Sequence, residues 1–162
     1  MSSLIRPVVV NTARHANLSL LSHGSDEIVP TTTLLRAAGI CDSDHVVVIG
    51  RGTLDHLIAL NRLNCRAVTV LHPDRALPGI DKADVIWVAG GVRADLKLLP
   101  KIQAAQGVRT VVIELAGIGA GNRLPVLLEE LRFEGFVHVV CHGTADRRAV
   151  MASRPDWLRR VV

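Results

Sequence analysis

A short glycine-containing turn directly after an apolar run is the stretch best suited to chemistry. Residues Val46–Ile49 are β-branched and unbroken, which is typical of a strand buried on both faces. The turn that follows consists of Gly50, Arg51, Gly52 and Thr53. Apolar residues at helical spacing begin at Leu54. Because glycine lets a ligand approach the main chain closely, this strand, turn and helix predict the first half of a nucleotide-binding βαβ unit.

The next two expected strands end in residues that extend the same site. A strand at Ala67–Leu71 stops at the sequence HPD, and a strand at Ala83–Ala89 stops at a glycine pair. The carboxyl ends of parallel strands meet at one edge of a sheet, where ligands of doubly wound folds bind. The candidate binding residues there are His72, Asp74 and Gly90. With a second glycine-rich loop at Ala116–Asn122, they are expected to surround the mouth of a small-molecule site.

Helical and strand patterns alternate along most of the chain. Further helices are expected at residues 34–38, 53–63, 96–106 and 124–133, and further strands at 108–115, 136–141 and 149–152. This alternation predicts an α/β fold with a doubly wound, mostly parallel sheet. The last two strands are predicted to form an antiparallel C-terminal hairpin.

The length of 162 residues fits a single domain. We expect a core at residues 34–155, an N-terminal arm at 1–33 and a tail at 156–162. The arm includes a candidate strand at Pro7–Val10. Its predicted role is a cap over the core, a pairing surface for a second copy, or a partly mobile segment.

Composition excludes several classes of protein. The chain lacks an apolar run long enough to span a membrane and lacks a signal-peptide core, so we expect a soluble cytoplasmic protein. The net charge of +4 is spread along the chain, with two Phe, two Trp and no Tyr, which disfavours nucleic-acid binding. Three scattered cysteines indicate reduced thiols.

Candidate metal and nucleophile sites are weak. His138 and His142 flank Cys141, but no second cluster with ligand spacing lies nearby, so no metal is expected. Cys141 and His142 do not make a nucleophile pair, because adjacent residues of a strand face opposite ways. The catalytic residues stay unknown at this point.

From Leu34 to Pro155 the chain resembles the S-adenosylmethionine-dependent methyltransferases of the Rossmann-like class. The resemblance rests on LLRAAGI, VVVIGRGT, VTVLHPD, ADVIWVAGG and the C-terminal stretch LLEELRFEGFVHVVCHGTADRRAVMASRP. It implies S-adenosylmethionine as the cofactor, bound at the glycine turn and at the end of the second strand. The antiparallel hairpin is the feature that separates this class from classical dinucleotide folds.

The chain departs from that family's pattern at several positions. Val48 stands where the family commonly has an acidic residue, and Leu54 stands at its third glycine. His72 matches the acid that binds the ribose hydroxyls, and imidazole lacks the paired acceptors of a carboxylate. Asp74 substitutes for that acid only if its loop bends inward. The connection to Ala83 is too short for the usual helix and third strand, so this region is predicted to be shortened.

Three functions remain open on the sequence. The first is a methyltransferase-like protein with a degenerate cofactor site, in which catalysis is mainly in-line positioning of the methyl group. The second is a non-catalytic module of the same fold that binds a ligand or pairs subunits. The third, a dinucleotide-binding oxidoreductase, ranks last because it requires an acid after the second strand and a complete glycine set. A homodimer is also expected, since a trimmed sheet exposes an edge.

Overall fold

The computed structural model describes residues 10–11, 31–50, 53–73, 79–90, 102, 107–116, 120–143 and 147–155. The helices in this part are α1 (Thr31–Ala37), α2 (Leu54–Arg62), α4 (Ala120–Phe133) and the 3₁₀ helix η1 (Ile80–Lys82). The strands are β1 (Val10–Asn11), β2 (His45–Gly50), β3 (Ala67–Leu71), β4 (Val85–Ala89), β5 (Thr110–Ala116), β6 (His138–Gly143) and β7 (Arg147–Ser153). Among these residues, no helix is long and apolar enough to cross a membrane.

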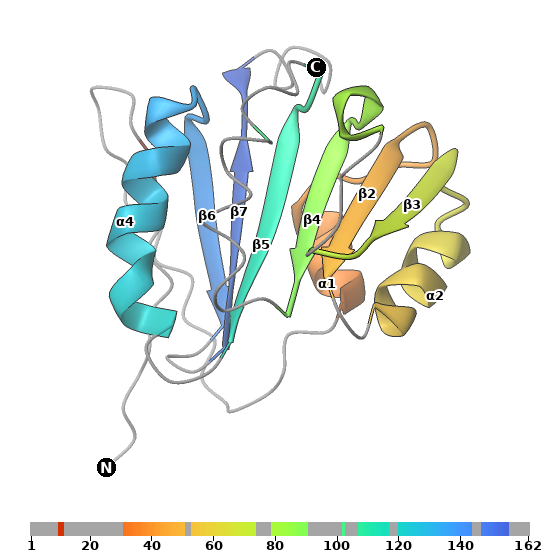
Figure 1. Ribbon diagram of the computed structural model, residues 1–162, viewed down its shortest axis with the longest axis horizontal. Helices are drawn as coiled ribbons and strands as arrows, with labels where there is room; N and C mark the ends of the chain where they lie inside the picture. Colours follow the sequence, from red (N-terminus) through yellow and green to blue (C-terminus); the bar gives the residue numbers. More distant parts are fainter. Residues whose placement is uncertain are drawn as a thin grey trace.

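All of the strands belong to one sheet with the order β1-β6-β7-β5-β4-β2-β3 (Figure 1). Strands β3, β2, β4 and β5 run parallel to one another. Strand β7 lies between β5 and β6 and is antiparallel to both. The predicted mostly parallel sheet with an antiparallel C-terminal hairpin is therefore confirmed.

Helices cover both faces of the sheet, because the strand residues alternate between two separate cores. Val47 and Ile49 of β2 belong to one core, with Leu127 and Leu131 of α4. The other core joins α1, α2 and the alternate strand residues, and its members include Leu35, Leu60, Val46, Val48 and Trp87. Figure 1 shows α4 beside β6 at one end of the sheet, and α1 and α2 near β2 and β3 at the other. The fold is doubly wound, as predicted.

Two aspartates stabilise the amino ends of the strands through hydrogen bonds and an ion pair. Asp44 is buried, pairs with Arg109 and accepts a hydrogen bond from the backbone N–H of Cys41 at 2.8 Å. Asp84 accepts one from the backbone N–H of His45 at 2.8 Å. These bonds hold the starts of β2, β4 and β5 together, so Asp84 has a structural role at the strand start.

Most predicted elements in this part of the chain are confirmed, with shifted ends. Strand β3 has the predicted bounds, while α1 begins at Thr31, before the predicted start at residue 34. Helix α4 begins at Ala120, so the end of the predicted loop Ala116–Asn122 is helical. Pro125 is inside this helix and its missing N–H removes only one bond, to the carbonyl of Gly121.

Further predictions concern the connection after β3, the N-terminal arm, the helix at residues 96–106 and the C-terminal tail. Strand β3 is at the end of the strand order, so no third methyltransferase strand lies beyond it in the described residues. At the opposite end, β1 adds two residues of the arm to the sheet by pairing antiparallel with β6. The helix predicted at residues 96–106, apart from Ile102, and the tail at 156–162 lie outside the described residues.

Candidate functional site at the carboxyl edge

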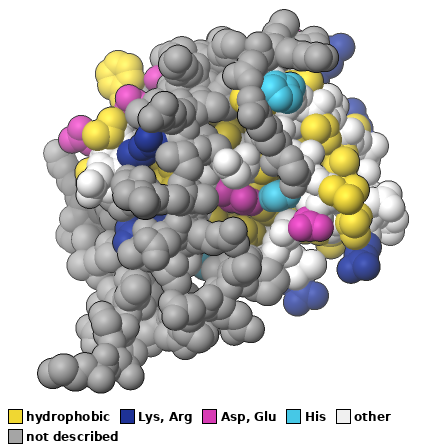
Figure 2. Space-filling view, turned by 60° about the horizontal axis from the view of Figure 1, so that its bottom comes forward, with side chains coloured by type: hydrophobic (Ala, Val, Ile, Leu, Met, Phe, Trp, Pro, Cys, Tyr) yellow, Lys and Arg dark blue, Asp and Glu magenta, His cyan; other side chains and the backbone are white. Residues whose placement is uncertain are grey.

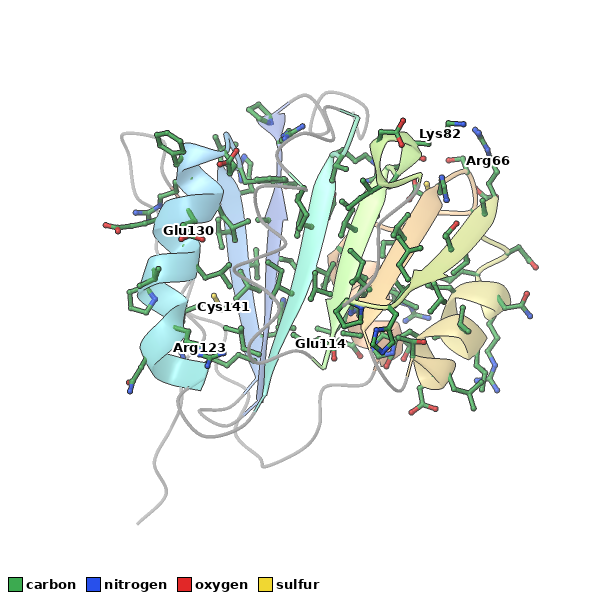
Figure 3. The ribbon with its side chains drawn as sticks, viewed as in Figure 1. Arg66, Lys82, Glu114, Arg123, Glu130 and Cys141 are labelled. Atoms are coloured by element: carbon green, nitrogen blue, oxygen red, sulfur yellow. The ribbon has the colours of Figure 1, made fainter. Side chains whose placement is uncertain are left out.

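The carboxyl ends of the central parallel strands meet at one edge of the sheet. Gly50 of β2 is in register with Ala89 of β4, and Ile49 is in register with Leu71 of β3. Figure 3 shows Glu114, near the end of β5, at this edge, with Arg66 and Lys82 at the opposite edge. The geometry thus brings the predicted residues Gly50, His72 and Gly90 to one edge.

The conformation of the chain at Gly50 has a packing cause. A Cβ atom built on Gly50 would lie 2.3 Å from the carbonyl oxygen of Ala89, far inside van der Waals contact. The ends of β2 and β4 approach each other too closely for any side chain at this position. Glycine is therefore required by the fold at Gly50, whether or not a ligand binds.

A cluster of three side chains from α2, β4 and β5 was not predicted from the sequence. His56 is on the buried side of α2, Trp87 is fully buried in β4, and Glu114 is in β5. The same Oε1 of Glu114 lies 2.7 Å from Nε2 of His56 and accepts a hydrogen bond from Nε1 of Trp87 at 2.7 Å. The rings of His56 and Trp87 meet edge to face, with centroids 5.2 Å apart. One carboxylate thus ties together α2, β4 and β5.

The surroundings of Glu114 favour its charged form. Burial alone would raise the pKa of Glu114, but hydrogen bonds from His56, Trp87 and the backbone N–H of Gly90, with the attraction of a charged His56, lower it below the ordinary value. The Glu114 side chain is 24% exposed, so the carboxylate still reaches the surface of the edge. Glu114 is therefore an ionised carboxylate at neutral pH.

The same cluster fixes the orientation of the His56 ring. Because Glu114 is a carboxylate acceptor, the ring nitrogen facing it, Nε2, carries a proton. The other nitrogen, Nδ1, is buried and has no hydrogen-bond partner among the described residues.

Figure 2 brings this edge of the molecule forward. Acidic and histidine side chains lie next to each other near the middle of the face, visible between grey atoms. Negative charge is therefore exposed at the edge where the predicted site lies.

The predicted site residues fall into two groups. Gly50, Thr53, His72 and Gly90 are described: Thr53 precedes α2 without making a side-chain cap bond, and His72 and Gly90 are exposed. Arg51, Gly52 and Asp74 lie outside the described residues. A ligand role for all seven stays a prediction.

The weak metal and nucleophile candidates have ordinary surroundings. The described residues contain no group of three or more His, Cys, Asp or Glu side chains arranged to hold a metal ion. Cys141 is buried in the core, and burial raises the pKa of its thiol. A thiol of raised pKa is a poor nucleophile at neutral pH.

Solved structures resemble the chain over most of its length. A ribosomal protein L11 methylase from Lactobacillus delbrueckii subsp. bulgaricus matches 91% of this chain and 98% of its own, with a TM-score of 0.61 and 14% identity. A protein in the NADB-Rossmann superfamily from Streptococcus agalactiae matches 79% of this chain and 69% of its own (TM-score 0.53, 13% identity). A dimethyladenosine transferase from Plasmodium falciparum matches 86% of this chain and 66% of its own (TM-score 0.54, 14% identity).

Comparison of sequences gives no closer assignment. No protein-family model matches the chain, and no curated protein matches it significantly. The chain therefore has the fold of the class I S-adenosylmethionine-dependent methyltransferases, at a low sequence identity to the solved structures.

Proposed function

We propose that this chain is a shortened methyltransferase-like protein that binds S-adenosylmethionine, or its demethylated product, at the carboxyl edge of β2, β3 and β4. The observation that carries the proposal is the junction of β2 and α2. It begins at Gly50, next to the end of β4, in a sheet where the antiparallel β7 lies between β5 and β6. In open α/β sheets, ligands bind beyond the carboxyl ends of the strands.

The charge of the edge supports a cationic ligand. S-adenosylmethionine carries a positive sulfonium and an ammonium group, and Glu114 provides a partly exposed carboxylate with a lowered pKa. Val48, by contrast, is fully buried and offers no charge. Methyl transfer itself depends mainly on placing donor and acceptor in line, so a fixed acid or base is not required.

A non-catalytic module of the same fold is the second candidate. It is favoured by the position of β3 at the end of the strand order and by His72 at the ribose-binding position. The described residues contain no strand beyond β3, which reduces the surface available to an adenine. The dinucleotide-binding oxidoreductase ranks below both, because the antiparallel pairing of β6 with β7 departs from a classical dinucleotide fold.

Calorimetric titration with S-adenosylmethionine and S-adenosylhomocysteine tests the proposal, with nicotinamide dinucleotides as controls. We expect micromolar binding of an adenosyl ligand, weakened at least about tenfold by Gly52→Val, because a branched side chain would obstruct the turn (about 1.4 kcal/mol per tenfold). Glu129→Gln changes an exposed residue of α4 and is expected to leave binding unchanged. No heat at millimolar ligand would favour the non-catalytic module.

A further inference from the structure

Among the described residues, strand β3 forms an edge of the sheet that carries no charged residue and no proline. In the described residues it has a neighbour, β2, on one side only. Its sequence, AVTVL, contains no charged residue and no proline, which are the common means of protecting an edge. Val70 is 40% exposed. A short apolar edge of this kind is suited to pairing with another strand.

The direction of the backbone groups shows which residues would pair. The N–H of Ala67 donates to the carbonyl of Asp44, so the polar groups of Ala67 face β2. Because these groups alternate along a strand, those of Thr69 and Leu71 also face β2, and those of Val68 and Val70 point outward. The outward groups are two residues apart and centred on Thr69.

We propose that two copies of this chain associate through β3, pairing antiparallel about a two-fold axis at Thr69. In this register, Val68 of each copy lies opposite Val70 of the other, and both outward-facing residues are hydrogen-bonded. The two Thr69 residues lie opposite each other as a non-hydrogen-bonded pair. A symmetric register needs no second sequence, which makes another copy of the chain the natural partner.

Charge is compatible with self-association at this edge. Each chain carries a net charge of +4, but the paired strands bring no charged side chain together. The nearest basic residue, Arg66, precedes the strand and is opposite His72 of the second copy in this register. Repulsion is therefore confined to the ends of the pair.

The buried area indicates the strength of the dimer. A pair of strands of five residues falls short of the roughly 1,000 Å² expected of a stable interface. Helix α2 lies on the same sheet face as Val68 and exposes Leu54 and Ile58, and the two-fold axis brings both copies of α2 to that face. Figure 2 shows hydrophobic side chains exposed on the right, the side of α2 and β3 in Figure 1. We expect a weak dimer with a micromolar dissociation constant.

Sedimentation of the full chain with a matched pair of variants tests this inference. Val70→Lys places a charge at the proposed edge, and Val126→Lys places the same charge on α4, where Val126 is 48% exposed. We expect at least a tenfold higher dissociation constant for Val70→Lys and no change for Val126→Lys. A wild-type monomer at about 100 μM, well above the micromolar range, would overturn the inference, as would equal effects of the two variants.

A disulfide tests the register directly. Opposite residues of a non-hydrogen-bonded pair have Cα atoms about 4.5 Å apart, within the range that a disulfide bridges. Thr69→Cys in a Cys41→Ser background, which removes the exposed thiol, is expected to form a covalent dimer under mild oxidation. Val126→Cys in the same background is the control. Failure of Thr69→Cys to cross-link faster than Val126→Cys would contradict pairing about Thr69, including the case in which another segment covers β3.

Discussion

At the scale of single residues, Glu114 is the side chain whose chemistry the fold has changed most clearly. His56, Trp87 and the backbone of Gly90 all donate to it and lower its pKa. A carboxyl group with a lower pKa in the folded state stabilises the fold above its unfolded-state pKa. This contribution is lost as the pH falls through the folded-state pKa, below about 4.5. The stability linked to Glu114 is therefore present at neutral pH and absent in strong acid.

Glu114→Gln tests this linkage through the free energy of unfolding in urea. We expect the variant to be about 1–3 kcal/mol less stable than the wild type at neutral pH, because it leaves buried donors poorly matched. The difference in unfolding free energy between the two proteins should narrow as the pH falls below about 4.5, because Glu114 of the wild type also becomes neutral there. Glu129→Gln, an exposed change on α4, controls for the loss of one charge. A gap that stays constant down to strong acid would show that Glu114 is not stabilised in its charged form.

The sequence contains few signals that predict the cluster of His56, Trp87 and Glu114. An acidic residue in the apolar run VVIEL is the one visible signal at Glu114, since a charge inside a buried strand needs partners. His56 and Glu114 are 58 positions apart in the chain. Periodicity places each of them on an element, but it does not show that the two elements bring them within a hydrogen bond.

At the scale of elements, the close approach of β2 and β4 shapes the candidate site. Gly50→Ala is expected to lower the free energy of unfolding by about 3 kcal/mol, because its Cβ would overlap the carbonyl of Ala89. Gly79→Ala is the matched control: Gly79 has a φ of 77° but nothing within 4 Å of an added Cβ. Gly79→Ala should lower the free energy of unfolding only by the energy of its backbone strain, about 1–2 kcal/mol. Equal losses in urea unfolding would mean that β2 and β4 are not held this closely.

The local sequence pattern was sufficient to predict most helices and strands. It failed where a residue type occurs in two structural settings. The alternating apolar residues of β3 gave its exact bounds. Thr31–Thr33 have the chemistry of helix caps but form the first turn of α1, and Pro125 is inside α4 rather than near its start. Packing of a helix against the sheet overrides such weak local preferences at the helix ends.

At the scale of the whole molecule, the mostly parallel sheet with its antiparallel hairpin was the most predictable property and the ligand the least. The short connection after β3 predicted a trimmed sheet, and β3 indeed ends the strand order. The hairpin of β6 and β7 followed from two strand patterns separated by a turn. The proposed binding at the carboxyl edge would involve residues of separate loops, among them Arg51, Gly52 and Asp74, whose arrangement no local pattern determines.

Backbone amide NMR during titration with S-adenosylhomocysteine tests the proposed cofactor site most directly. We expect saturable chemical-shift changes concentrated at Gly50, Thr53 and Gly90, which lie at the ends of β2 and β4 and at the start of α2. Amides of α4 at Val126 and Glu129 should not respond. Changes centred on α4, or no change at millimolar ligand, would contradict binding of the cofactor at the carboxyl edge.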